Sequence, residues 1–150
     1  VFGRNPDNAA TYIRDMTAAG FDVHAAPIAD LCREADLVVT TTPATHALIL
    51  PEHVHPGLHL TAVGADTPGK RELGMLHLAD RVVVDSLVQC RERGELASAE
   101  VDPARIVELG RVIDGAPGRT SPADVTVCDL TGVAVQDVQI ATAVCRRLGL

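Results

Sequence analysis

The sequence predicts a doubly wound α/β fold, in which helices cover both faces of a parallel sheet. Strand signals alternate with helix signals along nearly the whole chain, at intervals short enough to imply right-handed parallel crossovers. Several strand signals are near-continuous runs of apolar or β-branched residues, as a strand covered on both faces requires. With 150 residues, 47% of them hydrophobic, the chain is long enough for about one domain with a real core.

The first 42 residues predict a helix between strands. Residues 1–4 (VFGR) are typical of the tail of a strand, and the chain has no initiator methionine, so we expect a truncated chain. A helix should follow, because Asn5 can cap it, Pro6 suits its first turn and Gly20 can end it. The next segments are expected to form a short strand, a brief helix and a buried strand, at 21–26, 28–35 and 36–42.

The alternation continues through the middle of the chain. The runs LHLTAVGA and RVVVD are apolar enough for buried strands, and a helix is expected between them. Asp102 followed by Pro103 marks the start of a later helix. In chain order we expect a strand at 58–65, a helix at 70–79, a strand at 81–85, and helices at 86–97 and 102–109.

The last part of the chain predicts a loop, a strand and a long helix. Residues 115–124 are rich in Gly, Pro and Ser, which is typical of a loop. Residues 125–130 (VTVCDL) predict the final strand. The closing segment, 131–150, places apolar residues near one face of a helix, and Arg146 and Arg147 suit its negative end.

Composition and charge argue against several classes of function. A net charge of −7 and 2% aromatic residues provide neither a basic surface nor a stacking platform, so we expect no nucleic-acid partner. No apolar run approaches the roughly 20 residues of a membrane-spanning helix. Four widely spaced cysteines without a secretory leader predict reduced thiols in a cytoplasmic protein. A turn interrupts His53, His55 and His59, so we expect no metal site.

A sheet of this kind suggests a nucleotide-binding domain, although the usual glycine motif is missing. No G-x-G-x-x-G follows a first strand, because residues 1–4 would be the second strand of the unit. After that strand, an acidic residue binds the ribose of NAD, whereas an arginine accommodates the 2′-phosphate of NADP. Arg4 stands there, with no carboxylate until Asp7, which favours NADP(H). A solvated Arg4 at a strand end is an equal alternative on the local sequence alone.

Asp66 stands at the carboxyl end of the strand expected at 58–65. In a parallel sheet this edge is where ligands bind, so the carboxylate is a candidate for chemistry. The alternative is that it caps the DTPGK turn, as Asp residues commonly do. Lys70 is expected to be a surface residue or a partner of Asp66 or Glu72. Asp85, at the end of the next strand, is interpreted as structural.

Five segments resemble blocks of the ornithine cyclodeaminase/mu-crystallin family, in the family's order. The most specific are GADTPGKREL and DLTGVAVQD, and the resemblance covers essentially all 150 residues. The remaining blocks are VFGRNPDNAATY, ADLVVTTTPAT and RVVVDSLVQCRERGEL. The resemblance implies a Rossmann-type doubly wound parallel sheet that lacks its first strand, plus a C-terminal return helix. Residues 1–150 would then be a partial NAD(P)-binding domain, with the return segment at about 125–150 and the N-terminal substrate and dimerisation domain absent.

The resemblance also implies roles for individual residues. Asp66 matches the family's catalytic acid/base, which suits hydride exchange at a carbon that bears nitrogen. The residues near Arg4 resemble the family's NADP-type pattern, so NADP(H) is favoured, with NAD(H) as the alternative. The implied cofactor-binding residues are Arg4, Asn5, Asn8, Thr41, Thr42, Pro43, Val63, Gly64, Gly132 and Val133.

The implied function is that of an NAD(P)-dependent enzyme of amino-acid or imino-acid metabolism. It would be ornithine cyclodeaminase-like or a reductase of cyclic imines or ketimines. Its partner would be a small amino or imino acid, and the full-length protein is expected to be a homodimer. The alternatives are a non-catalytic dinucleotide-dependent binding protein of mu-crystallin type and an inactive fragment, which is the outcome expected for the 150 residues alone.

Overall fold

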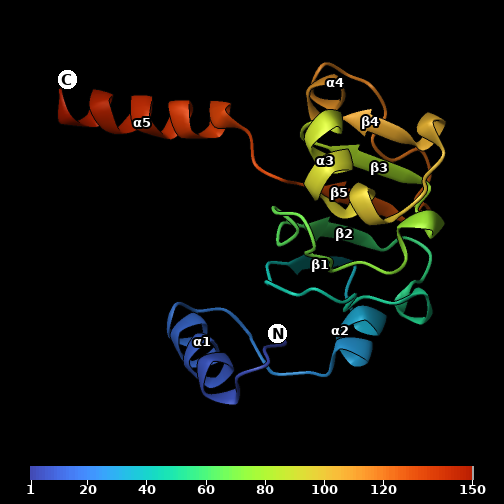
Figure 1. The fold of residues 1–150 in the computed structure, drawn as a ribbon. Helices are drawn as coiled ribbons and strands as arrows, with labels where there is room; N and C mark the ends of the chain where they lie inside the picture. The colour runs from blue at the N-terminus through green and yellow to red at the C-terminus, as the bar shows by residue number, and fades with distance from the viewer. Residues whose placement is uncertain (150) are drawn as a thin grey trace.

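The structure, a computed structural model that describes residues 1–149, contains a parallel sheet of five strands. The strand order is β1-β2-β5-β3-β4, and each neighbouring pair runs parallel, which confirms the α/β prediction. Figure 1 shows β1 and β4 at opposite edges of the sheet. The strands are β1 (Leu37–Thr40), β2 (His59–Ala62), β3 (Arg81–Val84), β4 (Ile106–Glu108) and β5 (Thr126–Asp129).

Five α-helices connect or flank these strands in residues 1–149. The first begins as expected, with Pro6 in its first turn and the Asn5 side chain accepting hydrogen bonds from the N–H groups of Asp7 and Asn8. None of the helices in the described part is long and apolar enough to cross a membrane. They are α1 (Pro6–Ala18), α2 (Ile28–Glu34), α3 (Leu87–Arg93), α4 (Leu109–Ile113) and α5 (Ala134–Leu148).

The core lies along the three central strands. Leu60, Val127 and Val82 sit in register across β2, β5 and β3, and none of them has exposed surface. The edge strand β1 is different, because Leu37 and Val39 are 57% and 55% exposed. The sheet is therefore well packed at its centre and open along β1.

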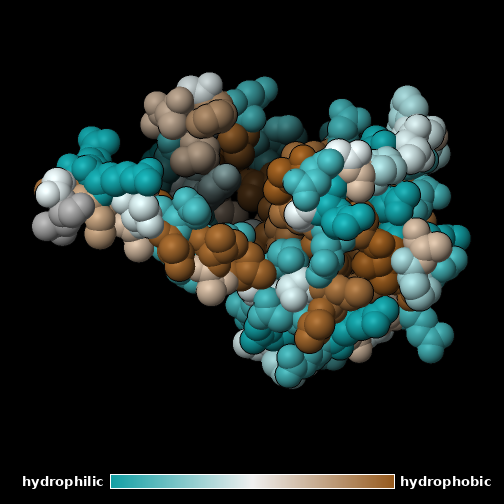
Figure 2. Space-filling view, turned by 90° about the horizontal axis from the view of Figure 1, so that it is seen from above, coloured by the Kyte–Doolittle hydropathy of each residue, from teal (hydrophilic) through white to brown (hydrophobic). Residues whose placement is uncertain are grey.

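The first and last helices stand apart from this core. Figure 1 shows α1 beyond the β1 edge and α5 projecting away from the sheet, and neither helix buries a residue. Figure 2 shows hydrophobic residues on the projecting arm. Nothing in residues 1–149 covers this apolar surface of α5, which includes Val135, Val138, Ile140, Val144 and Leu148.

The prediction of a helix at 70–79 is wrong. This segment forms no α-helix, and its only helical turn is the short 3₁₀ turn at Leu76–Leu78. The Glu72 carbonyl accepts the N–H groups of Leu48 and Ile49, and Leu73 forms a parallel bridge with Ile49. The backbone groups that a helix would pair locally are thus used by a distant segment.

The prediction of a helix at 102–109 is also wrong. Asp102 does cap a turn, since its carboxylate accepts the N–H of Ala104 at 2.9 Å, but this 3₁₀ turn ends at Arg105. The chain then enters β4, where Ile106 pairs with Val82 of β3. Pairing with a neighbouring strand suits the β-branched residues of β4 better than a helix does.

The strands expected at 1–4 and 21–26 are absent from the sheet. The two segments bond briefly to each other, because the Val1 amino group donates to the His24 carbonyl at 2.7 Å and the Ala26 N–H donates to the Val1 carbonyl at 3.1 Å. Neither belongs to the five-stranded sheet. An apolar or β-branched run becomes a strand only where a partner ladder is available.

Candidate functional site

The carboxyl ends of the strands form one edge of the molecule because the strands are parallel. In a doubly wound sheet this edge is where ligands bind. Thr41 follows β1 directly, Val63 follows β2, and Gly132 comes shortly after β5. The topology therefore brings distant parts of the sequence to a common edge.

A pocket of about 560 Å³ lies where the start of α1 faces the loop after β1. Its volume falls in the range of roughly 300–1,000 Å³ that is usual for small-molecule sites. Its lining includes six of the residues expected to bind a cofactor: Arg4, Asn5, Asn8, Thr41, Thr42 and Pro43.

The polar groups of this pocket differ in what they can still bind. Asn5 Oδ1 already accepts two backbone N–H groups, because it caps α1. Arg4 is exposed and makes no hydrogen bond or ion pair through its side chain within residues 1–149. A guanidinium can bind a phosphate through two parallel hydrogen bonds, and Arg4 is the arginine in the lining of this pocket.

Glu72 holds the ends of β1 and β2 together, a role that the sequence reasoning missed. Its carboxylate is fully buried and accepts three hydrogen bonds: from Thr40 Oγ1 at 2.7 Å, from the Thr42 N–H at 2.6 Å and from the Gly64 N–H at 2.8 Å. Thr42 and Gly64 were expected near the cofactor. The signal that could have revealed Glu72 is a lone acidic residue next to apolar ones in RELGML.

Two further buried carboxylates continue this arrangement across the sheet. Glu95 accepts the N–H groups of Glu72 and Leu73, at 2.7 and 3.0 Å. Asp129, at the end of β5, accepts the N–H groups of Glu95 and Leu96, at 3.0 and 3.1 Å. Burial raises the pKa of Asp129, and it raises the pKa of Glu95 to about 7 against the opposing effect of these hydrogen bonds. Each carboxylate fixes the backbone of the next residue in the series.

Asp85 fixes the turn after β5 in a similar way. Its Oδ2 accepts the N–H groups of Thr131 and Gly132, at 2.9 and 2.6 Å. Its Oδ1 accepts the Ser86 N–H at 2.8 Å and the Thr131 hydroxyl at 3.1 Å. Gly132 and Val133 do not line the pocket beside α1, so the structure places them at a separate part of the carboxyl edge.

Asp66 is exposed and forms an ion pair with Lys70 at 2.6 Å. The hydrogen bond from Lys70 is the main cause that lowers the pKa of Asp66 below its usual value. Its N–H donates to the Gly64 carbonyl, so its position follows from that of Gly64. Of the partners considered for Lys70, Asp66 is the observed one, because Glu72 is buried with other donors.

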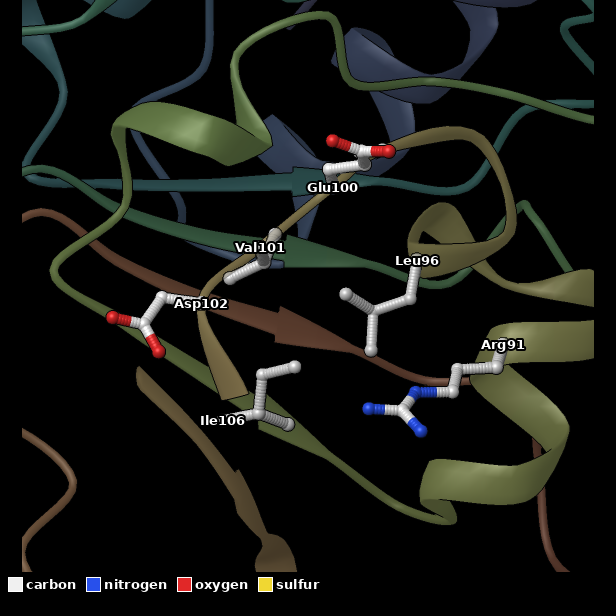
Figure 3. A pocket seen from close by; sticks show the side chains of 7 residues that line it. Arg91, Leu96, Glu100, Val101, Asp102 and Ile106 are labelled. Carbon is white, nitrogen blue, oxygen red and sulfur yellow. The ribbon is translucent and has the colours of Figure 1, made fainter. Parts of the chain in front are cut away.

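Elsewhere the described residues offer little chemistry. They contain no group of three His, Cys, Asp or Glu side chains that could hold a metal ion. A second pocket, of about 450 Å³, lies beside α3 and β4. In Figure 3 the Arg91 guanidinium reaches toward Ile106, whereas the carboxylates of Glu100 and Asp102 point outward. The charged groups do not converge there as they do at a ligand site.

The family model that matches this chain is that of the ornithine cyclodeaminase/mu-crystallin family, over residues 1–149. The chain belongs to this family. Among its relatives are an uncharacterized cyclodeaminase, y4tK, of Sinorhizobium fredii, which is 43% identical over 75% of this chain, and an alanine dehydrogenase of Archaeoglobus fulgidus, which is 39% identical over 77%. The matched region spans only 37% and 38% of those two proteins.

Solved structures of the family have the same fold. The iminosuccinate reductase of Paracoccus denitrificans in complex with NAD⁺ is 31% identical and superposes over 95% of this chain and 46% of its own, with a TM-score of 0.86. An archaeal alanine dehydrogenase dimer with bound NAD is also 31% identical, over 96% of this chain and 48% of its own, with a TM-score of 0.87. The chain thus spans about half the length of these NAD-bound members.

The close approach at Gly64 predicts that this position tolerates no side chain. A Cβ there would overlap the Thr42 carbonyl oxygen and lie 2.5 Å from Glu72 Cδ. We expect Gly64→Ala to lower the free energy of unfolding by about 3 kcal/mol, because backbone atoms cannot move aside as a flexible side chain can. Gly110→Ala is the control, since a Cβ at Gly110 in α4 would meet no atom within 4 Å beyond its chain neighbours and its own helix backbone, and it should be neutral or stabilising by about 0.5–1 kcal/mol. Urea denaturation measures both, and equal effects would contradict the prediction.

Burial of Glu95 predicts a pH-dependent stability. Its folded-state pKa of about 7 lies above the ordinary value of 4.5, so the folded protein binds the proton more tightly than the unfolded chain. The stabilising contribution of protonated Glu95 should be complete below about pH 4.5 and should be lost as the pH rises through 7. Tm measured between pH 4.5 and 8 should therefore depend less on pH in Glu95→Gln than in the wild type. The exposed Glu100→Gln serves as the control and should keep the wild-type dependence.

Proposed function

We propose that the protein is an NAD(P)-dependent enzyme that acts on a small amino or imino acid. The observation that carries this proposal is the pocket at the carboxyl edge, which joins Arg4 and Asn8 of the α1 start to Thr41–Pro43 after β1. Membership of a family with NAD-bound members supports it. The relatives include a cyclodeaminase, a dehydrogenase and a reductase, and the proposed reaction is ornithine cyclodeaminase-like or reduction of a cyclic imine or ketimine.

Asp66 is the proposed acid/base of this reaction. When bound, the nicotinamide cofactor supplies or accepts a hydride at a carbon that bears nitrogen. A carboxylate near that nitrogen can take its proton when the amine is oxidised and return it when the imine is reduced. The ion pair with Lys70 keeps Asp66 ionised, and its exposure leaves it open to a ligand.

NADP(H) is the proposed cofactor, in preference to NAD(H). A 2′-phosphate requires a cation near the end of the second strand of the dinucleotide unit, and Arg4 lies in the pocket without a partner in the described part of the chain. A carboxylate that could bind the ribose hydroxyls of NAD is absent from the lining of this pocket. Two solved structures of family members hold NAD⁺ or NAD, which supports a nicotinamide dinucleotide as the cofactor class.

We further propose that residues 1–150 are part of a larger dinucleotide-binding unit. A groove of about 570 Å³ runs between Val1–Gly3 and β1, and it exposes the edge of β1 to pairing with one more strand. The uncovered apolar residues of α5 support packing against another domain or subunit, and the proposed assembly is a homodimer. Four free cysteines suit the reducing cytoplasm, which is the proposed location.

The cofactor preference can be tested by titrating the full-length protein with NADPH and NADH. We expect NADPH to bind more tightly, and Arg4→Ala to raise its Kd by about tenfold or more, because one charge-assisted phosphate contact is lost. The Kd of NADH should change little. Arg14→Ala is the control, because Arg14 is an exposed arginine of α1, the helix that follows Arg4. If Arg4→Ala weakened both cofactors equally, the 2′-phosphate assignment would be wrong, and if neither bound, so would the cofactor site.

The role of Asp66 can be tested by turnover with ornithine, alanine and pyrroline-2-carboxylate in the full-length protein. Asp66→Asn should lower kcat by about 10²–10⁴ and leave cofactor Kd unchanged, because the amide cannot accept the proton. Lys70→Gln should move the acidic limb of the pH–rate profile to higher pH, since Lys70 lowers the pKa of Asp66. Full activity in Asp66→Asn would exclude the assignment, and cofactor binding without turnover by the wild type would favour a binding protein.

A further inference from the structure

Glu72 is a charged side chain without exposed surface, and neither the cofactor contacts nor the proton transfer proposed above uses it. Its three donors come from two strand ends: the Thr40 hydroxyl and the Thr42 N–H from the β1 side, and the Gly64 N–H from the β2 side. All three distances lie between 2.6 and 2.8 Å. Such short bonds to a buried carboxylate are the strong, charge-assisted kind.

These bonds stand at the point where β1 and β2 stop pairing. The Val63 N–H still donates to the Thr40 carbonyl at 2.9 Å, as in the parallel ladder. One step further, the N–H groups of Thr42 and Gly64 both turn to the Glu72 carboxylate. The Glu72 carboxylate thus takes the place of a backbone acceptor beyond the last ladder hydrogen bond, and it determines how the segments after β1 and β2 separate.

The two segments lead to different parts of the proposed site. Thr42 and Pro43 line the pocket beside Arg4, whereas Gly64 leads to Asp66, whose N–H donates to the Gly64 carbonyl. The Glu72 carbonyl also accepts the N–H of Leu48, another residue of the pocket wall. The Glu72 N–H in turn donates to the Glu95 carboxylate. The position of Glu72 is therefore determined by the protein and passed on to both sides of the site.

We propose that Glu72 is a positioning residue that sets the place of the acid/base Asp66 relative to the cofactor pocket. The inference rests on the proposed function, because it assigns a purpose to the spacing between these two parts. A carboxylate is required, since both of its oxygens only accept, whereas the NH₂ group of glutamine would face an N–H. Aspartate is one methylene shorter and could not reach all three donors from the same backbone position.

The experiment compares Glu72→Gln with Leu58→Ala in the full-length protein. Leu58 is buried in the core and takes part in none of the three hydrogen bonds of the Glu72 carboxylate. Its truncation therefore lowers stability without removing these bonds. In Glu72→Gln we expect faster hydrogen exchange of the Thr42 and Gly64 amides without cofactor, a Kd for the bound dinucleotide raised by about tenfold, and a lower kcat. Leu58→Ala should keep the wild-type Kd and kcat while folded.

Thr40 provides a second and milder test, in case Glu72→Gln does not fold. Thr40→Val removes only the hydroxyl donor and should raise the cofactor Kd and lower kcat. Thr40→Ser retains the hydroxyl and should keep both the Kd and kcat near their wild-type values. If folded Glu72→Gln, or Thr40→Val, kept the wild-type exchange rates, Kd and kcat, the inference would be overturned. If amide exchange were faster in Glu72→Gln but the wild-type protein bound no dinucleotide, the role of Glu72 in holding the two strand ends would be supported and the proposed function refuted.

Discussion

Three buried carboxylates, those of Glu72, Glu95 and Asp129, hold the loops of this protein in place through backbone N–H groups. Asp129 fixes the start of the segment at Glu95, Glu95 fixes the backbone of Glu72, and Glu72 joins the ends of β1 and β2. A buried charge is costly unless hydrogen bonds compensate it, and each of these side chains has two or three donors. The series connects residues 72–73 and 95–96, which lie outside the five strands, to the ends of β1, β2 and β5.

The series explains how a chain with little regular structure between β2 and β3 keeps a definite path. The segment between Gly64 and Met75 contains no α-helix, and its order comes from tertiary bonds such as those of Glu72. Asp85 performs the same task at the turn after β5. Both sides of the carboxyl edge are therefore shaped by acidic side chains that accept backbone N–H groups.

The charged groups at this edge divide by exposure into two kinds. Glu72 and Asp129 are buried and hold the backbone, whereas Arg4 and Asp66 are exposed and open to a ligand. This division follows from electrostatics. A side chain that binds and releases a ligand has to stay hydrated between cycles, whereas the hydrogen bonds of one that holds the fold are stronger in the low dielectric around it.

The fold class, the family and most strands could be predicted from the amino-acid sequence, because runs such as VVT and VVV are local signals of a buried parallel sheet. The sequence also predicted the Asn5 cap of α1, whose donors lie two and three residues away. The remaining features depend on contacts between segments that lie far apart in the sequence. Residues 70–75 form no helix because Glu95 and the segment at Leu48 take the backbone groups of Glu72 and Leu73, and residues 106–108 are a strand because β3 lies beside them. The role of Glu72 depends on donors from Thr40 and Gly64, and only folding brings these together.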